Sequence, residues 1–316
     1  MKKAVLGATN ISFFPLIFGT LPLGPLQAGL SPSEGGRLIR HALEHGVTML
    51  DTATLYDTYP HVREGIAGWQ GDVTIVTKTH ANDGPTARSH VEKGLRELGR
   101  ERLDIVHLHG ARVAEPFTER IEVLEELLRM KDEGKIGHVG LSSHYICAIR
   151  KAADHQEIEV VHPLINRTGM GILDGSAVEM AEAIAGCARA GKGVYAMKAL
   201  AGGNLIAEAR ESLAYVRGLE GVHGVAIGML SEAEIEANIA LFSGKAPEDE
   251  VWRQLESRRR KLRIMENFCK GCGGCVDACA SGALSIANGK AVLDEESCIL
   301  CGYCAASCPE FIIRVV

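Results

Sequence analysis

Eight of the ten cysteines in this chain of 316 residues lie close to its end, in two runs of identical spacing. The runs are Cys269-x2-Cys272-x2-Cys275-x3-Cys279 and, 18 residues later, Cys298-x2-Cys301-x2-Cys304-x3-Cys308-Pro309. Three thiolates at this spacing can bind three corners of an iron–sulfur cubane, and the fourth cysteine of each run then ligates the other cluster. Zinc sites favour Cys-x2-Cys pairs or mixed Cys/His sets instead, and disulfides are rare in a cytosolic chain. The spacing therefore predicts two interlocked 4Fe-4S clusters.

Four titratable side chains stand where successive apolar runs end, and they are Asp51 and Tyr56, Lys78, and His109. Each has an ordinary explanation by itself. An Asp that closes a strand is often a cap, a Lys there is often exposed, and His107-x-His109 is either a metal pair or core packing. Their joint placement is the evidence for a shared site.

Reduction of a carbonyl by hydride requires a proton donor for the developing alkoxide. Free tyrosine, with a pKa of about 10, donates poorly at neutral pH unless neighbouring cations favour the phenolate. Lys78 can supply that charge, Asp51 would keep Lys78 charged and oriented, and His109 would hydrogen-bond the substrate oxygen. We therefore expect Tyr56 to be the catalytic acid.

Short apolar runs alternate with amphipathic segments between residues 13 and 243, which is typical of repeated βα units. We predict strands over 15–19, 47–50, 73–78, 103–109, 138–141, 159–162, 193–197 and 222–227. The helices between them are predicted over 32–45, 61–69, 85–98, 119–133, 145–153, 176–190, 206–218 and 232–242. Eight such pairs fit a (β/α)8 TIM barrel, whose active site lies at the carboxyl ends of the strands; a doubly wound sheet is the alternative.

The last fifty residues resemble a bacterial-type two-cluster ferredoxin, with all eight ligands present between Asn267 and Val316. The resemblance implies that one 4Fe-4S cluster is held by Cys269, Cys272, Cys275 and Cys308, and the other by Cys298, Cys301, Cys304 and Cys279. One position departs from the pattern, because Ala280 replaces the proline that usually follows the fourth cysteine. The two remaining cysteines, Cys147 and Cys187, are expected to be buried and inert.

The chain upstream, from Phe13 to Phe242, resembles the aldo-keto reductase superfamily. Beside the four titratable residues, the matching segments are 18–24, 140–143, 196–203 and 227–238, which resemble the family's first strand and loop, its nicotinamide site, its pyrophosphate loop and its adenosine site. The resemblance implies NAD(P)H contacts from Gly19, Thr20, Ser142, Ser143, Met197, Lys198, Gly228 and Asn238. Departures are Ser143 in place of the usual Asn, Glu159 where a nicotinamide-binding Gln is common, and Leu230 and Glu234 in the adenosine segment.

Three segments are expected along the chain: a barrel over 1–246, a linker helix over 247–266 and a small α+β ferredoxin-like iron–sulfur domain over 267–316. The linker contains no Gly or Pro after Pro247, and its apolar residues recur at helical spacing. A helix of this length rises ~27 Å, so it would return the chain along the barrel and place the clusters near the catalytic mouth. The cationic run 258–261 could bind phosphate or form a solvated face.

Composition restricts the class of partner. A net charge of −6 gives no general basic field for nucleic acid. The most apolar stretch, 13–26, is interrupted by three prolines and two glycines, so no membrane span is expected. Polar residues also interrupt the N-terminal apolar segment, which argues against a signal peptide and makes the cytoplasm the expected location.

The leading hypothesis is an oxidoreductase that uses NAD(P)H to reduce an aldehyde or ketone, or to oxidise the alcohol, with a ferredoxin module for one-electron transfer. Because hydride carries two electrons and each cluster passes one, a flavin or an external redox protein docking at the ferredoxin domain would have to join the two. The alternative is an electron-transfer subunit whose barrel is a scaffold without turnover. Glu232, Glu234 and Glu236, with no cation in segment 228–238, favour NADH over NADPH unless they only begin a helix.

Overall fold

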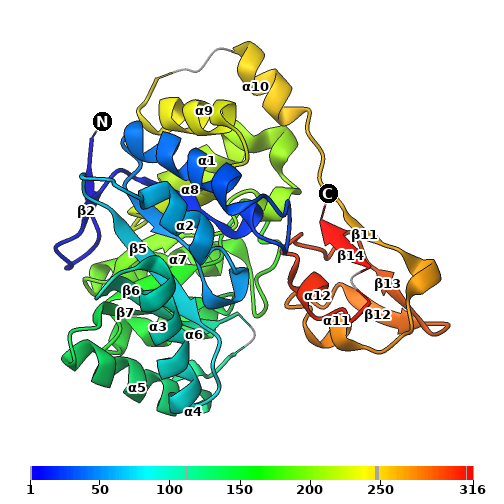
Figure 1. Cartoon of the computed structure of the whole chain (residues 1–316), viewed down its shortest axis with the longest axis horizontal. Helices are drawn as coiled ribbons and strands as arrows, with labels where there is room; N and C mark the ends of the chain where they lie inside the picture. Colours follow the sequence, from blue (N-terminus) through cyan, green and yellow to red (C-terminus); the bar gives the residue numbers. More distant parts are fainter. Residues whose placement is uncertain (1, 112, 246–248, 311, 316) are drawn as a thin grey trace.

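Eight parallel strands close into a barrel in the computed structural model, which describes residues 2–111, 113–245, 249–310 and 312–315 (Figure 1). In chain order the strands are β3 (Leu16–Gly19), β4 (Met49–Asp51), β5 (Thr74–Thr79), β6 (Leu103–Gly110), β7 (Ile136–Ser143), β8 (Val160–Pro163), β9 (Gly193–Ala196) and β10 (Gly224–Gly228). The barrel closes because β10 pairs with both β9 and β3. This confirms the predicted TIM barrel and excludes the doubly wound sheet.

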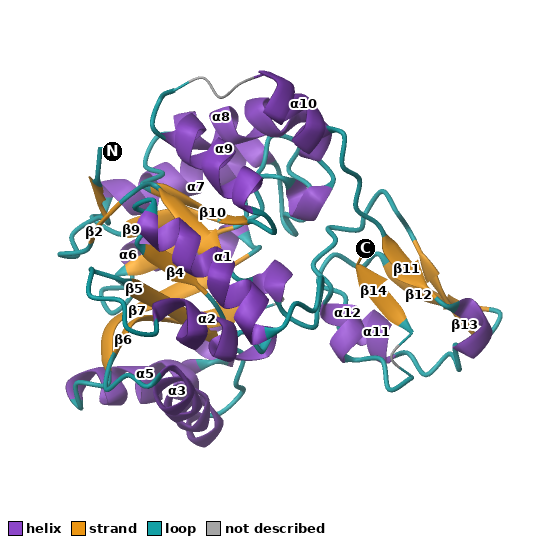
Figure 2. Cartoon of the chain, turned by 45° about the horizontal axis from the view of Figure 1, so that its top comes forward, coloured by secondary structure: helices purple, strands orange, loops and turns teal. Residues whose placement is uncertain are grey.

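Helices surround the barrel at the predicted places, as Figure 2 shows. They are α1 (Pro32–Glu44), α2 (Tyr59–Ile66), α3 (Gly84–Leu98), α4 (Pro116–Glu119), α5 (Ile121–Asp132), α6 (Ile146–Asp154), α7 (Ala177–Arg189), α8 (Ala209–Gly218) and α9 (Glu232–Phe242). Local sequence sets several of their starts. Ser31 and Ser176 form capping boxes, and Asp83 caps α3 through its side chain.

A short hairpin that the sequence did not reveal covers the amino-terminal end of the barrel. It pairs β1 (Ala4–Val5) with β2 (Ser12–Phe13). Leu6 and Phe13 are fully buried against inward residues of the barrel strands, including Ile17 and Tyr195. Strands of two residues are too short to show an alternating pattern, which is why periodicity missed them.

The linker helix is shorter than the one predicted over 247–266, while the domain boundary at 267 stays a prediction. Helix α10 runs only from Asp249 to Glu256, and residues 247 and 248 lie outside the described residues. From Leu262 the chain is extended, because β11 (Leu262–Ile264) pairs with β14 (Ile313–Val315) near the end of the chain. Pairing with a distant strand thus overrides the helical pattern.

The C-terminal domain contains two similar halves. Each has a short helix, α11 (Gly274–Asp277) or α12 (Tyr303–Ala306), that follows a glycine with positive φ, Gly273 or Gly302. A hairpin of β12 (Leu284–Ala287) and β13 (Lys290–Leu293) lies between the halves. Cysteines of both runs are buried together with aliphatic side chains in the core of this domain.

The C-terminal domain lies beside the carboxyl ends of the barrel strands (Figure 1), as expected, although the helix that was to place it there is shorter than predicted. Its loop 298–303, which we call the docking loop, contacts barrel loops by main-chain approach and hydrogen bonds. Asn204 donates to the carbonyl of Cys298 at 2.7 Å, and Gln27 donates to that of Leu300 at 3.3 Å. Ile299 is buried against Leu164 and Met197 of the barrel.

Two glycines permit this close approach. A Cβ atom on Gly202 would lie 1.7 Å from the carbonyl oxygen of Ile299, and one on Gly302 would lie 2.3 Å from that of Leu26. Neither contact leaves room for a side chain. Within the ranges that the structure describes, no helix is both long and apolar enough to cross a membrane.

Replacement of Gly202 by Ala should displace the docking loop without unfolding the barrel. The measurement is hydrogen exchange of amides in 298–303, which should become faster. Gly134→Ala is the matched control, because Gly134 also has positive φ but a Cβ there would meet no atom within 4 Å. Both variants carry the same backbone penalty of roughly 1–2 kcal/mol, so equal exchange in the two would contradict this packing.

Candidate active site and cysteine centre

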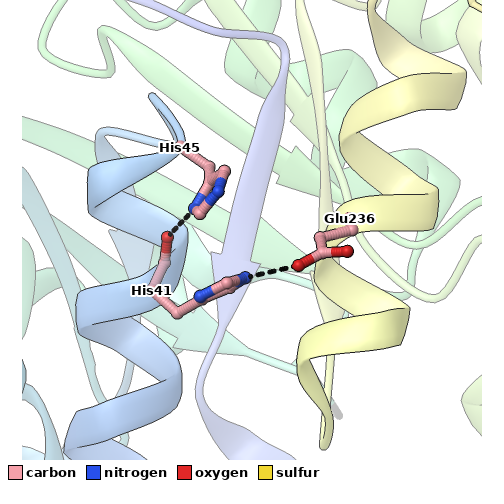
Figure 3. A group of neighbouring side chains, drawn as sticks. All are labelled: His41, His45 and Glu236. Atoms are coloured by element: carbon pink, nitrogen blue, oxygen red, sulfur yellow. Dashed lines mark hydrogen bonds and ion pairs between the residues drawn. The ribbon is translucent and has the colours of Figure 1, made fainter.

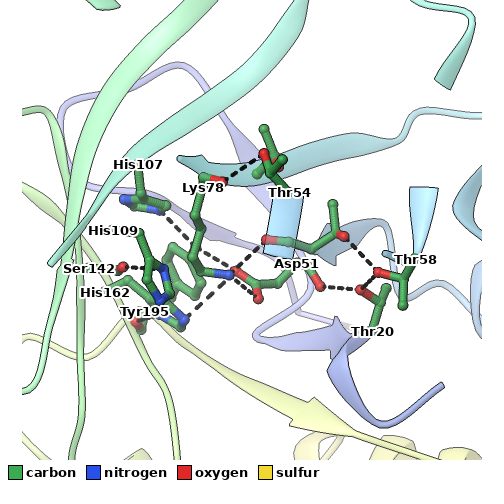
Figure 4. A network of polar contacts seen from close by, with 12 residues as sticks. Thr20, Asp51, Thr54, Thr58, Lys78, His107, His109, Ser142, His162 and Tyr195 are labelled. Atoms are coloured by element: carbon green, nitrogen blue, oxygen red, sulfur yellow. Dashed lines mark hydrogen bonds and ion pairs between the residues drawn. The ribbon is translucent and has the colours of Figure 1, made fainter. Parts of the chain in front are cut away.

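The structure brings Asp51, Tyr56, Lys78 and His109 together at the mouth of the barrel. Figure 4 shows three of them, Asp51, Lys78 and His109. Asp51 ends β4, Lys78 and His109 lie near the ends of β5 and β6, and Tyr56 ends the 3-10 turn η2 (Thr54–Tyr56). Lys78 Nζ donates to Asp51 Oδ1 at 2.6 Å and to the carbonyl of Thr52 at 2.8 Å. The same ammonium lies 4.9 Å from the centre of the Tyr56 ring.

Tyr195, His107 and His162 complete this buried group, and of these only His107 stood out in the sequence. Tyr195 donates its hydroxyl to Asp51 Oδ2 at 2.8 Å, and His107 Nε2 lies 2.8 Å from the same hydroxyl. The ring of His162 stacks on Tyr195 at 4.0 Å. His107 thus packs in the barrel interior, which supports the packing explanation of His107-x-His109 over the metal pair. Polar residues at inward positions of β6, β8 and β9 were the available signal.

Burial controls the charge states in this group. It lowers the pKa of Lys78, an effect that Asp51 opposes, and it lowers the pKa of His109 well below the usual range, so that this imidazole is neutral. Burial, together with Tyr303 and Asp51, raises the pKa of Tyr56 well above its usual value. Tyr56 therefore keeps its proton in this docked arrangement, and the role of Lys78 toward the phenolate stays a prediction.

Most residues expected to contact NAD(P)H have partners within the barrel. Gly19 and Gly228 face each other in the pairing of β3 with β10. Thr20 donates to the carbonyl of Asp51 at 3.0 Å, and Ser143 accepts from the amide of Tyr145 at 3.0 Å. Ser143 also donates its hydroxyl to the carbonyl of Gly110 at 3.4 Å. These contacts position the strand ends and use the donor of each hydroxyl.

Two other residues expected to contact NAD(P)H are Ser142 and Asn238. Ser142 lies near the mouth, and Asn238 has one polar atom without a partner among the described residues. Ser142 Oγ lies 3.2 Å from His109 Nδ1, which orients the imidazole. Asn238 donates to the carbonyl of Glu234 at 2.8 Å, while its buried Oδ1 has no hydrogen-bond partner among the described residues. Asn238 thus stays a candidate for the adenosine site.

Glu159 does not lie where a nicotinamide-binding residue would. It precedes the first residue of β8, at the end of the strand away from the mouth, and it pairs with Lys131 and His138. These partners outweigh burial and lower its pKa to about 2. The mouth end of β8 is held by His162 instead.

The expected preference for NADH rested on the lack of a cation in segment 228–238. In the structure, cations from other segments reach Glu234 and its neighbours. Arg258 of the linker forms an ion pair with Glu234, Arg37 pairs with Glu232, and His41 Nε2 lies 3.1 Å from Glu236. Arg260 donates to Gln27 Oε1 at 2.6 Å beside the docking loop. Glu232 and Glu234 are thus each paired with an arginine, and the choice between NADH and NADPH stays a prediction without this support.

The docking loop covers the segment expected to bind the pyrophosphate. Met197 packs against Ile299 and Cys301, and Lys198, held at a positive φ of 62°, lies near Cys298 and Cys301. Gly202 touches the main chain of Ile299. NAD(P)H therefore does not fit this segment while the C-terminal domain is docked as in this structure.

The side chain of Tyr303 reaches from the docking loop into the group of four. Its hydroxyl lies 3.4 Å from His109 Nε2 and hydrogen-bonds with Tyr56. Its ring packs edge-on against that of His109, with centroids 6.3 Å apart. No sequence pattern pointed to this residue, because it is a single tyrosine between two cysteines.

The cysteines group in space as the two predicted ligand sets. Cys279, Cys298, Cys301 and Cys304 line one pocket, and Cys275 has Cys269, Cys272 and Cys308 among its electrostatic neighbours. The amides of Ala283 and Ala291 donate to Cys279 Sγ and Cys269 Sγ at 3.2 and 3.3 Å. Such N–H···S bonds suit sulfur that carries negative charge.

The spacing of the sulfur atoms fits a cluster better than a zinc ion. Around tetrahedral zinc, sulfurs at about 2.3 Å from the metal lie roughly 3.8 Å from one another. Among the described residues, which include all eight of these cysteines, no three of these sulfurs lie within 4.8 Å of one another. The two remaining cysteines are separate, and Cys187 is buried and donates to the carbonyl of Ile149 at 3.1 Å.

His41, His45 and Glu236 form a third group of metal-ligating side chains, on helices α1 and α9 outside the barrel (Figure 3). His45 Nδ1 lies 2.8 Å from the carbonyl of His41, whose own Nε2 faces Glu236. These hydrogen bonds join the end of α1 to α9, and they account for the placement of all three side chains.

Comparison with known proteins finds the aldo/keto reductase family over residues 15–218 and the 4Fe-4S dicluster domain over residues 268–312. The uncharacterized oxidoreductase YqkF of Bacillus subtilis (strain 168) is 28% identical over 158 residues, 45% of this chain and 49% of the relative. Aflatoxin B1 aldehyde reductase member 2 of Rattus norvegicus is 32% identical over 147 residues, 42% of this chain and 39% of the relative. The matches thus span less than half of these curated relatives.

Solved structures share the fold. A Pseudomonas aeruginosa protein assigned to the aldo-keto reductases superposes with a TM-score of 0.66 at 24% identity, covering 77% of this chain and 95% of that chain. The holo form of aldo-keto reductase AKR11C1 from Bacillus halodurans gives 0.64 at 22% identity, covering 81% of this chain and 95% of that one. At such identities the likeness concerns the barrel architecture.

Anaerobically prepared protein should contain about eight iron and eight acid-labile sulfide per chain, from two 4Fe-4S clusters. Cys275→Ser and Cys304→Ser should each lose about half of the iron and different features of the reduced EPR spectrum, because they belong to different sets. Cys147→Ser is the control, and it should keep all of the iron and the complete EPR spectrum. Stoichiometric zinc with little iron would contradict the assignment.

Asp51→Asn should destabilise the barrel by about 3–5 kcal/mol, because it leaves the buried Lys78 without its anion. Chemical denaturation followed by circular dichroism measures this. The double variant Asp51→Asn/Lys78→Met is the control, and it should recover part of the loss since no unpaired charge stays buried. A double variant less stable than Asp51→Asn would show that the ion pair is not the source.

Proposed function

Because the chain belongs to the aldo/keto reductase family, we propose that it is an oxidoreductase that interconverts a carbonyl compound and the corresponding alcohol at the mouth of its barrel. The observation that carries this proposal is the convergence of Tyr56, Lys78, Asp51 and His109 at the ends of consecutive strands. A relative named as an aldehyde reductase supports the choice of a carbonyl.

These residues would manage the proton half of the reaction. Tyr56, held protonated by burial, donates to the oxygen as the carbonyl is reduced. His109 is neutral and binds the same oxygen, while the ammonium of Lys78 stabilises the phenolate that proton transfer leaves behind. Asp51 positions Lys78 through the 2.6 Å ion pair.

NAD(P)H is the hydride donor that the family implies. Its proposed contacts include Met197 and Lys198, which the docking loop covers in this structure. We therefore propose that NAD(P)H binds only after residues 298–303 leave the mouth, and the proton roles above do not depend on it.

The two cysteine sets would hold two 4Fe-4S clusters, which supply one-electron transfer when bound. The set that contains Cys279, Cys298, Cys301 and Cys304 faces the barrel, and the other set faces outward, with Cys272 exposed. Phe268 and Met265, also exposed, lie close to that outward set in the chain. A redox protein would thus dock at the outward set, and such clusters suit a reducing compartment such as the cytoplasm.

The second candidate is an electron-transfer subunit whose barrel does not turn over. The observation that favours it is the docking loop over the mouth. Anaerobic assays of cluster-replete protein with a panel of aldehydes, ketones and alcohols distinguish the two candidates. Carbonyl-dependent oxidation of NADH or NADPH supports the enzyme, whereas its absence, together with reversible cluster reduction by a ferredoxin, supports the electron-transfer subunit.

Tyr56→Phe should lower the rate of carbonyl reduction at least about 100-fold, because general acid catalysis contributes that much or more. The affinity for nicotinamide, measured by anaerobic titration, should stay nearly unchanged, since the hydroxyl acts on the alkoxide.

Tyr59→Phe is the matched control for this change. Its hydroxyl is equally buried but bonds Thr54 and Thr77 instead of facing the mouth. This variant should keep wild-type turnover after correction for stability. Near wild-type turnover in Tyr56→Phe would refute the role of Tyr56.

A further inference from the structure

Tyr303 stands at an unusual position, between two cysteines of the barrel-facing set and against the catalytic residues of the other domain. It begins α12, directly after Gly302, whose positive φ turns the chain toward the barrel. Its hydroxyl contacts both Tyr56 and His109, at 3.4 Å from His109 Nε2. Among the described residues, no other hydroxyl contacts both groups.

Tyr56 and His109 are the two groups that would bind the oxygen of a carbonyl or an alcohol. A single oxygen that touches both already fills the position that such a ligand needs. We propose that the hydroxyl of Tyr303 occupies the substrate-oxygen position of the barrel, so that the docked domain and the substrate compete for one site. This inference rests on the proposed function, because it takes Tyr56 and His109 as the oxygen-binding pair.

The surroundings of the Tyr303 ring identify the class of ligand. The ring packs between two apolar groups of the barrel mouth. One contains Leu26, Ala53 and Tyr56, and the other contains Leu164 and Met197. The space that the side chain fills thus has apolar walls and one polar end, which suits a planar ring that carries a single oxygen function. An aryl aldehyde or aryl alcohol of about the size of the tyrosine side chain has this chemistry.

Competition at this position links the two domains thermodynamically. A ligand that displaces Tyr303 favours undocking of loop 298–303, and undocking favours the ligand by the same factor. The docking contacts beside Tyr303 are one small apolar cluster, in which Ile299 packs against Leu164 and Met197, and hydrogen bonds such as those of Gln27 and Asn204 with main-chain carbonyls. Displacement of one side chain therefore needs no disruption of either core, because the cores of the barrel and the C-terminal domain are separate.

The test truncates the Tyr303 side chain to that of alanine and adds p-cresol, a free molecule with the same ring and hydroxyl as the tyrosine side chain. Cluster-replete Tyr303→Ala, the full chain, is titrated anaerobically with p-cresol by calorimetry, and toluene is the probe without the oxygen. We expect Tyr303→Ala to bind p-cresol at least about tenfold more tightly than toluene, because the hydroxyl regains two hydrogen bonds. Wild type should bind p-cresol at least about tenfold more weakly than Tyr303→Ala, because its own side chain fills the site.

Two controls locate the effect. Tyr303→Phe keeps the ring and removes the hydroxyl, so it should bind neither probe. Ile286→Ala removes an exposed apolar side chain elsewhere in the same domain and should behave as wild type. Benzaldehyde should compete with p-cresol in Tyr303→Ala, which tests the carbonyl class directly.

Hydrogen exchange of segments 198–204 and 298–303 reports whether the domain is still docked in each variant. Equal binding of p-cresol by wild type and Tyr303→Ala would overturn the inference. Failure of folded Tyr303→Ala protein to bind p-cresol would also overturn the inference, whether the C-terminal domain is docked or undocked. Every measurement in this test is a binding measurement. If the barrel shows no carbonyl turnover, the proposed function is refuted, but the binding test of Tyr303 can still be carried out and interpreted.

Discussion

The buried ion pair of Lys78 and Asp51 is the interaction on which the barrel interior depends. Two charges placed in a closed barrel cost solvation, and that cost is offset only when each remaining polar atom has a partner. Lys78 therefore also donates to the carbonyl of Thr52, and Asp51 accepts from Tyr195. Tyr195 in turn holds His107 and His162, so a chain of polar contacts crosses the interior and fixes the ends of the strands.

The second constraint is the close approach of two main chains at the mouth. Gly202 and Gly302 allow the docking loop to lie against the barrel without intervening side chains. This approach brings the barrel-facing cysteine set next to the catalytic group. It also covers the segment proposed to bind the pyrophosphate, so under the proposed function domain docking and cofactor binding would compete for one surface.

This arrangement bears on how two-electron and one-electron chemistry share a chain. Under the proposed function, hydride transfer would need the mouth open, whereas the barrel-facing cysteine set lies at the mouth when the domain is docked. The proposed displacement of Tyr303, whose ring packs against His109, would then separate the two kinds of chemistry in time. The set around the exposed Cys272 would be the one that a redox partner reaches.

The sequence by itself determined the ligand sets, the barrel and the four titratable residues. These follow from local spacing and from periodicity, which act between residues that are near in the chain. The register of parallel strands then brings Asp51, Lys78 and His109 to one edge, as a barrel requires. Only the tertiary structure decided the length of the linker helix, the place of Glu159 at the far end of β8 and the cations around Glu234. It alone also placed Tyr303 at the mouth, because each of these depends on contacts between segments far apart in the chain, which no local pattern encodes.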